Sequence, residues 1–200
     1  HPAGDVLIDS IAVSTVGMAG LNTLQVEFNP NYDQPEQTHV NNIAEIGFNV
    51  TGDNINPMLD VTFDGVRIMN GDIVSAKPTI QITLKDENRF LLMNDISDTA
   101  KFRVRMKSPT DADFVIVPFY SNGVQLMQFV PASASNKCYV IYKGSFPTDG
   151  TYQLEVEAMD KSNNLSGTNK YLISFEVLNK STITDVMNWP NPFSTATHFV

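Results

Sequence analysis

The stretch that decides the fold is Asp149-Gly150-Thr151-Tyr152-Gln153-Leu154-Glu155-Val156-Glu157-Ala158. From Tyr152 to Ala158, apolar side chains alternate with polar ones, which is the period of a strand with one buried face. The Asp-Gly pair in front of it is a turn former. The stretch therefore predicts a tight turn that leads into a half-buried strand.

The same alternation recurs along most of the chain. We predict strands at 6–13, 24–28, 45–50, 59–63, 80–84, 102–106, 138–142, 154–158 and 172–177, with turn formers at 64–65, 70–72, 122–123 and 162–164. Helical spacing reaches at most about two turns, at 86–93. Many short strands separated by turns predict an all-β, immunoglobulin-like antiparallel β-sandwich.

Tyr152 stands at the start of a late strand, directly after a tight turn. This is the place of the tyrosine corner in immunoglobulin-like folds, where the hydroxyl bonds to backbone a few residues upstream. We therefore predict a structural role for Tyr152 and no role in binding.

The spacing of strands divides the chain into three parts. The first 52 residues hold about three strands, too few to close a sandwich, so they are either extra strands or the end of a preceding domain. Residues 53–180 hold enough strands for one immunoglobulin-sized sandwich. Residues 181–200 are rich in Thr, Ser, Asn and Pro and are predicted to be a linker. We expect the chain to be a piece of a longer protein.

Charge excludes one class of partner and hydropathy excludes another. The chain of 200 residues has 13 Lys and Arg against 22 Asp and Glu, a net charge of −9. A nucleic acid is not an expected partner, because few cations are available to replace phosphate counterions. No membrane span is expected either, since no apolar run approaches the roughly 20 residues that a bilayer requires.

The sequence predicts no catalytic, cofactor-binding or metal site. Cys138 lies in an apolar strand pattern, and the only histidines are His1, His39 and His198, so a Cys-His pair is not expected. Acidic clusters at 86–88, 95–98 and 111–113 could offer oxygens to Ca²⁺, but they lack the spacing of an EF-hand and are interpreted as solvated loops. Glu155 and Glu157 alternate with apolar residues and are expected on a solvated face. Eight late aromatic residues are expected mainly in the core: Phe114, Phe119, Tyr120, Phe129, Tyr139, Tyr142, Phe146 and Tyr152.

Three stretches resemble known bacterial modules. Residues 149–167, with Tyr152, Asp160 and Asn164, resemble the final hairpin of bacterial immunoglobulin-like modules. Residues 52–88 look like the module near the C-terminus of type IX secretion surface proteins, including gingipain-like peptidases and sortase-like relatives. The segment Asn188-Trp189-Pro190-Asn191-Pro192-Phe193 resembles the first strand of the type IX sorting domain, with Trp189 in place of the usual Tyr. Residues 1–52 loosely resemble the last strands of a CARDB-type module.

These resemblances imply a function. The chain would be a non-catalytic spacer in a secreted or outer-membrane cell-surface protein, placed between an upstream effector and the sorting signal. Its partners would be the upstream domains of the same chain and the type IX secretion machinery. The machinery would bind the complete sorting domain, which begins with Trp189, Pro190, Asn191, Pro192 and Phe193. Any peptidase Cys and His would lie upstream. The alternative is an adhesion module that binds a carbohydrate or protein through loops at the end of the sandwich.

Overall fold

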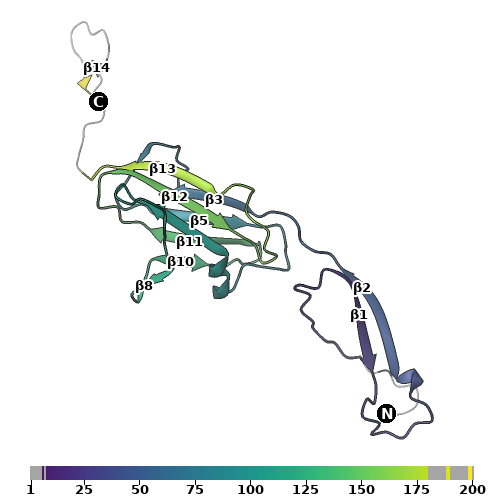
Figure 1. Ribbon diagram of the computed structural model, residues 1–200. Helices are drawn as coiled ribbons and strands as arrows, with labels where there is room; N and C mark the ends of the chain where they lie inside the picture. Colours follow the sequence, from purple (N-terminus) through teal and green to yellow (C-terminus); the bar gives the residue numbers. More distant parts are fainter. Residues whose placement is uncertain (1–5, 7, 180–187, 190–197, 200) are drawn as a thin grey trace. The chain divides into compact units, whose positions relative to one another are not determined.

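The computed structural model describes residues 6, 8–179, 188–189 and 198–199, the last four as backbone only. The chain divides into two compact units, His1–Ile55 and Asn56–Val200. Regular structure in both units is almost entirely β, as Figure 1 shows. The predicted all-β class is confirmed.

The first unit contains one antiparallel hairpin. Strand β1 (Gly20–Glu27) pairs with β2 (Ile43–Val50), and a short 3₁₀ helix, η1 (Val40–Asn42), precedes β2. Leu24 lies opposite Ile46 and Val26 opposite Ala44, so the register gathers apolar side chains on one face. In the described part of this unit no second sheet covers that face.

The strand predicted at 6–13 does not form. Val6 and residues 8–13 lie outside any strand, and the side chains of Val6, Ile8 and Ile11 are exposed. The alternation is present in the sequence, but a strand needs a neighbour to accept and donate its backbone hydrogen bonds. Among the described residues no strand pairs with this segment.

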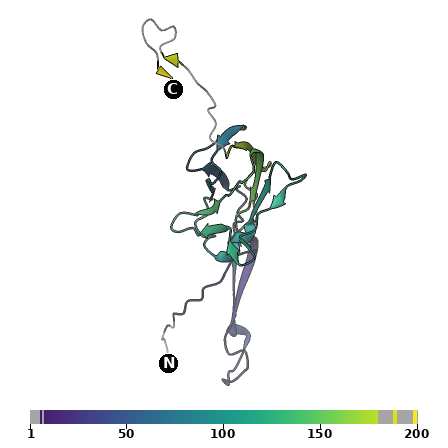
Figure 2. The ribbon, with the colours of Figure 1, turned by 90° about the vertical axis from the view of Figure 1, so that its left-hand side faces the viewer.

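The second unit is a sandwich of two sheets. The first sheet has the order β10-β11-β5-β3, formed by Met127–Val130, Lys137–Lys143, Thr79–Lys85 and Met58–Phe63. The second has the order β4-β13-β12-β6-β7, formed by Asp72–Val74, Tyr171–Val177, Gly150–Ala158, Phe102–Lys107 and Val115–Ile116. A small hairpin of β8 (Tyr120–Ser121) and β9 (Val124–Gln125) is added. This is the predicted immunoglobulin-like sandwich, seen close to end-on in Figure 2.

The first strand of the sandwich is split between the sheets. β3 pairs with β5 in one sheet, and β4, which follows it in the chain, joins the other sheet. There β4 runs parallel to β13, whereas the other strand pairs are antiparallel. The two sheets are thus joined by one continuous stretch of chain.

The core lies between the sheets, where the inward side chains of both alternate as predicted. Val61, Ile82 and Val140 from one sheet are buried, as are Leu154 and Phe175 from the other. Of the aromatic residues expected here, Phe146 and Tyr152 are buried and contact Phe175. Phe119, Phe129 and Tyr142 pack on the core edge, but Tyr120 is exposed because it lies in the β8–β9 hairpin.

The turn before β12 requires glycine. Gly150 has φ +129°, and a Cβ there would lie 3.0 Å from Pro109 Cγ. The chain then enters β12, where the Tyr152 hydroxyl donates a hydrogen bond to Thr148 O at 3.0 Å. The tyrosine thereby ties the strand back to the turn that precedes it.

The helical content is small and differs from the prediction. No helix forms at 86–93, where Asn88 Oδ1 instead accepts hydrogen bonds from the backbone amides of Phe90 and Leu91. A 3₁₀ helix, η2 (Ile96–Lys101), follows and leads directly into β6. Asx turns at Asn88 and the capping residue Asp95 explain why the helix begins late.

The chain enters and leaves the sandwich at opposite ends. Met58, the first residue of β3, pairs with Lys85, beside the loops that contain Asn94, Asn136 and Lys161. Val177, the last residue of β13, pairs with Gly150 and Val74 at the other end. Figure 1 shows the chain reaching the sandwich at one end and leaving it at the other.

The last described strands are β14 (Asn188–Trp189) and β15 (His198–Phe199), which pair with each other. Of the predicted sorting motif, Trp189 therefore lies in β14. Pro190, Asn191, Pro192 and Phe193 lie outside the described residues.

Candidate functional site

The candidate site is the end of the sandwich where β3 begins, which we call the polar end. Three loops meet there: 86–101 between β5 and β6, 131–136 before β11, and 159–170 between β12 and β13. The four buried polar or charged residues of the described chain, Asp86, Asp98, Asn136 and Asp160, all lie in these loops. Buried polar groups need partners, so the contacts of these four residues define the site.

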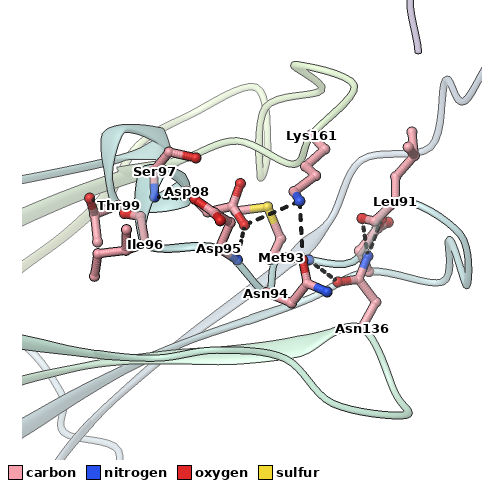
Figure 3. Close-up of polar contacts among 11 residues, drawn as sticks. Leu91, Met93, Asn94, Asp95, Ile96, Ser97, Asp98, Thr99, Asn136 and Lys161 are labelled. Atoms are coloured by element: carbon pink, nitrogen blue, oxygen red, sulfur yellow. Dashed lines mark hydrogen bonds and ion pairs between the residues drawn. The ribbon is translucent and has the colours of Figure 1, made fainter. Parts of the chain in front are cut away.

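Asn136 joins two of the loops. Its Nδ2 donates to Asp86 Oδ2 at 3.0 Å and to Leu91 O at 3.1 Å, and its Oδ1 accepts from the Met93 amide at 2.9 Å. The Asp86 amide also donates to Asn136 O at 2.8 Å. Each polar atom of the Asn136 side chain thus has a partner, as Figure 3 shows.

A capping box orders the start of η2. Asp95 Oδ1 accepts from the Ser97 amide at 2.8 Å, and Asp98 Oδ2 accepts from the Asp95 amide at 2.9 Å. These are the reciprocal contacts that satisfy free amides at a helix start. Hydrogen bonding from Ser97 holds the pKa of Asp95 below its ordinary value, so the cap stays ionised at neutral pH.

Lys161 connects the third loop to the first. Its Nζ lies 3.4 Å from Asp98 Oδ2 and 3.3 Å from Asn94 Oδ1. The Asp98 side chain is only 6% exposed, whereas that of Lys161 is 26% exposed. Figure 3 shows the lysine reaching across to both residues.

The predicted structural residues Asp160 and Asn164 hold the β12–β13 loop closed. The Asn164 amide donates to Asp160 Oδ1 at 2.8 Å, and Asn164 Nδ2 donates to Asp160 Oδ2 at 2.8 Å. The Asp160 amide donates in turn to Asn164 O at 3.1 Å. This closed loop fixes the backbone on both sides of Lys161.

Three further residues singled out in the sequence, Cys138, Glu155 and Glu157, lie outside these loops. Cys138 lies in β11 and is fully buried. Burial raises the pKa of its thiol to about 12, so it stays protonated and poorly nucleophilic at neutral pH. Glu155 and Glu157, expected on a solvated face, are half-buried and pair with Arg105, Arg103 and Lys170 across the sheet. These ion pairs on the surface of the sheet account for the positions of the two carboxylates.

One shallow groove of about 340 Å³ runs beside the polar end, along the edge of β6. Pro118 interrupts the pairing of β7 with β6 because it has no amide to donate. The side chains or backbone of Phe102, Phe119 and Met159 line the groove, together with Lys101 and Arg103. The groove thus has apolar residues together with Lys101, Arg103 and Glu157, and the last two form an ion pair.

Sequence reasoning found part of the polar end. The sequence predicts Asp160 and Asn164 as structural residues, and it indicates 95–98 only as a group of carboxylates in a solvated loop. The spacing Asp95-Ile96-Ser97-Asp98 is also that of a capping box, which was the missed signal. Asn94, Asn136 and Lys161 carry no local signal, because their partners lie far away in the sequence.

Comparison with known proteins gives limited likeness. No family model and no curated protein matches the sequence. Among solved structures, the chain is similar to the dimeric latent PorU of Porphyromonas gingivalis, with 18% identity and a TM-score of 0.43, over 74% of this chain and 13% of that one.

Two structures of the S-layer protein SbsC are also similar. One has 15% identity and a TM-score of 0.27, over 76% of this chain and 17% of that one. Domains 1–6 of SbsC have 12% identity and a TM-score of 0.27, over 90% and 23%. The chain thus spans less than a quarter of the length of each protein. Among the described residues, no helix has the length and apolar character needed to cross a bilayer.

Proposed function

We propose that residues 56–179 form a non-catalytic structural spacer in a bacterial surface or secreted protein exported by type IX secretion. The spacer links an upstream effector to a C-terminal sorting signal, which begins at Trp189 and continues through Pro190–Phe193. The resemblance of residues 52–88 and 188–193 to type IX modules supports the export route and the surface location.

The observation that carries the spacer role is the path of the chain. It enters the sandwich at Met58 and leaves at Val177, at the opposite end. The nine residues of β12 span roughly 30 Å at the usual strand rise. A module of this kind separates the segment before it from the segment after it by about the length of its strands.

Stiffness is the second support for this role. The polar end holds three loops together through Asn136, Asp98 and Lys161. At the other end, the Asn179 amide donates to Asp149 Oδ1 at 2.7 Å, and Asn179 Nδ2 donates to Phe146 O at 3.2 Å. The loops beside the entry point and the segment that leaves the sandwich are thus each held by side-chain contacts.

Residues 1–52 belong, in this proposal, to the end of a preceding β-domain of CARDB type. The β1–β2 hairpin supports this because one face carries Leu24, Val26 and Ile46 and remains exposed. A two-stranded hairpin is only marginally stable alone, so further strands are needed to cover it. Strands of the same preceding domain would supply that cover.

The test exchanges the sandwich within the full-length natural protein. Residues 56–179 are replaced by an unrelated immunoglobulin-like sandwich of similar length, whose chain also enters and leaves at opposite ends. Surface-attached protein and effector activity are then compared with a deletion and with a flexible Gly/Ser segment of equal residue number. A spacer predicts near-normal surface display for the exchange and reduced display for the deletion. Equal loss in the exchange and the deletion contradicts the proposal, because it would mean that this particular surface is required.

The groove beside β6 favours a second function, binding of a carbohydrate or an extended peptide as an adhesion module. Its apolar lining residues and the polar groups of Lys101, Arg103 and Glu157 support binding of such a ligand. The test is a binding screen of the chain against an oligosaccharide array and a peptide library, compared with the variant Phe119→Ala. Ligands that bind the natural chain and lose binding in the variant favour adhesion over a passive spacer.

A further inference from the structure

Three side chains at the polar end bring together the groups that an amide-forming reaction needs. Lys161 Nζ lies 3.3 Å from Asn94 Oδ1 and 3.4 Å from Asp98 Oδ2, so an amine, a carboxamide and a carboxylate meet at one point. The amine and the carboxamide come from loops 67 residues apart in the sequence. Figure 3 shows these three groups together, with the lysine between the other two.

The backbone holds both reacting residues in place. On one side, Met93 is buried, its amide donates to Asn136 Oδ1, and its carbonyl accepts from the Ala132 amide at 2.8 Å. On the other side, the Met159 amide donates to Lys101 O at 3.0 Å, and Asp160 is buried. Asn94 and Lys161 each directly follow these fixed residues. Holding two reactants in contact removes much of the entropic barrier to their reaction.

We propose that Lys161 and Asn94 form an intramolecular amide bond, with Asp98 as the proton carrier. Asp98 takes a proton from the Lys161 ammonium group, and the free amine attacks Asn94 Cγ. The new bond joins Nζ to Cγ, and the bond between Cγ and Nδ2 breaks. Asp98 returns its proton to Nδ2, which leaves as ammonia and carries away the second amine proton. The reaction needs no oxidant, reductant or external cofactor.

Asp98 is placed for this role. It is nearly fully buried, and it faces Lys161 through the same oxygen that accepts from the Asp95 amide. Asp98 thus contacts the nucleophile directly, and Lys161 Nζ in turn contacts Asn94 Oδ1, so the three groups form a chain from carboxylate to amine to carboxamide. A carboxylate in contact with the nucleophile is the arrangement for general base catalysis. The bond would fasten the β12–β13 loop covalently to the loop before β6.

The chain offers an internal control. Lys101 Nζ donates to Asn163 Oδ1 at 2.5 Å, so a second lysine also contacts a carboxamide. In the part of the chain that the structure describes, no ion pair joins Lys101 to a carboxylate. If contact alone were enough, this pair would react as well; if the carboxylate is required, only Lys161 reacts.

The experiment is mass spectrometry of the purified 200-residue chain. The expected intact mass is lower than the sequence mass by one ammonia molecule. Trypsin then yields a branched peptide in which residues 90–101 are joined to residues 144–170, because linked Lys161 resists cleavage. Lys161→Arg and Asn94→Ala abolish the branched peptide, and Lys101→Arg keeps it. Asp98→Asn retains an oxygen to accept from the Asp95 amide and slows the reaction about a hundredfold or more.

Two outcomes overturn the proposal. One is a chain at its full sequence mass, with Lys161 still open to acetylation. The other is a mass loss that maps to Asn70-Gly71 or Asn122-Gly123, where an Asn-Gly pair loses ammonia by closing a succinimide. That product is not branched and hydrolyses on standing, so the branched peptide separates the two reactions. If Asp98→Asn fails to fold, as judged by circular dichroism, Lys161→Arg alone still decides the matter.

Discussion

The β1–β2 hairpin and the sandwich have the same kind of sequence but differ in how far their apolar side chains are buried. Both alternate apolar and polar residues, and both pair their strands in antiparallel register. In the sandwich the apolar face is closed by a second sheet, so Ile82 and Phe175 are fully buried. In the hairpin, Phe48 remains 36% exposed and Ile46 61% exposed. In these two regions the alternation accompanies paired strands, whereas burial of the apolar face depends on a second layer.

Hydrogen exchange is expected to show the largest difference between the two regions. Amides of the central strands β5 and β12 should open only by global unfolding, whereas those of β1 and β2 should open locally. We expect exchange about a thousandfold or more slower in the sandwich, measured by mass spectrometry of the 200-residue chain. Equal protection of both regions would break the comparison. The preceding β-domain of the proposal, when joined to the chain, should slow exchange in β1 and β2.

Removal of a large core side chain is the next largest effect. Phe175→Ala empties a site among Phe63, Phe146 and Tyr152 and should lower the free energy of unfolding of the sandwich by about 3–5 kcal/mol. The matched variant Phe48→Ala in the hairpin should change the same transition by less than about 0.5 kcal/mol. Urea denaturation followed by tyrosine fluorescence measures both. A similar loss in the two variants would mean that the hairpin shares the core.

Loss of the Asn136 side chain tests the polar end. Asn136→Ala leaves the Met93 amide and Asp86 without these partners and should cost about 2 kcal/mol in the same denaturation assay. Asn49→Ala, at an exposed position of β2, serves as the control and should be nearly neutral. A neutral Asn136→Ala would show that the three loops are held by other contacts.

The smallest predicted effect concerns the tyrosine corner. Tyr152→Phe removes only the hydrogen bond to Thr148 O and should cost about 1 kcal/mol. Tyr120→Phe removes a hydroxyl from an exposed side chain and should leave stability unchanged within error. The difference between the urea denaturation midpoints of the two variants measures the contribution of the Tyr152 hydroxyl. Equal midpoints would mean that Tyr152 contributes through packing alone.

The sandwich could be predicted well from the sequence because apolar and polar residues alternate along each of its main strands. The strands expected at 59–63, 80–84 and 154–158 lie within β3, β5 and β12. The segment 6–13 has the same period and forms no strand, since pairing depends on a neighbour that local sequence cannot supply.

The candidate site was less accessible to sequence reasoning. Asn136 contacts residues 43 to 50 positions away, and Lys161 contacts Asn94 across 67 positions. Neither residue type has a periodic signal, and both are common on surfaces. The predicted pair Asp160 and Asn164 and the capping-box spacing Asp95-x-x-Asp98 are different, because in each the two partners lie within four residues of each other.

The parallel pairing of β4 with β13 has a mechanical consequence. When the chain is pulled at Met58 and at Val177, the load passes through the strand pair that joins the first and last segments of the sandwich. Because these strands are parallel, tension slides one along the other, so their hydrogen bonds bear the force together and do not open one after another. The fold thus places a strand pair oriented for shear between the points where the chain enters and leaves the sandwich.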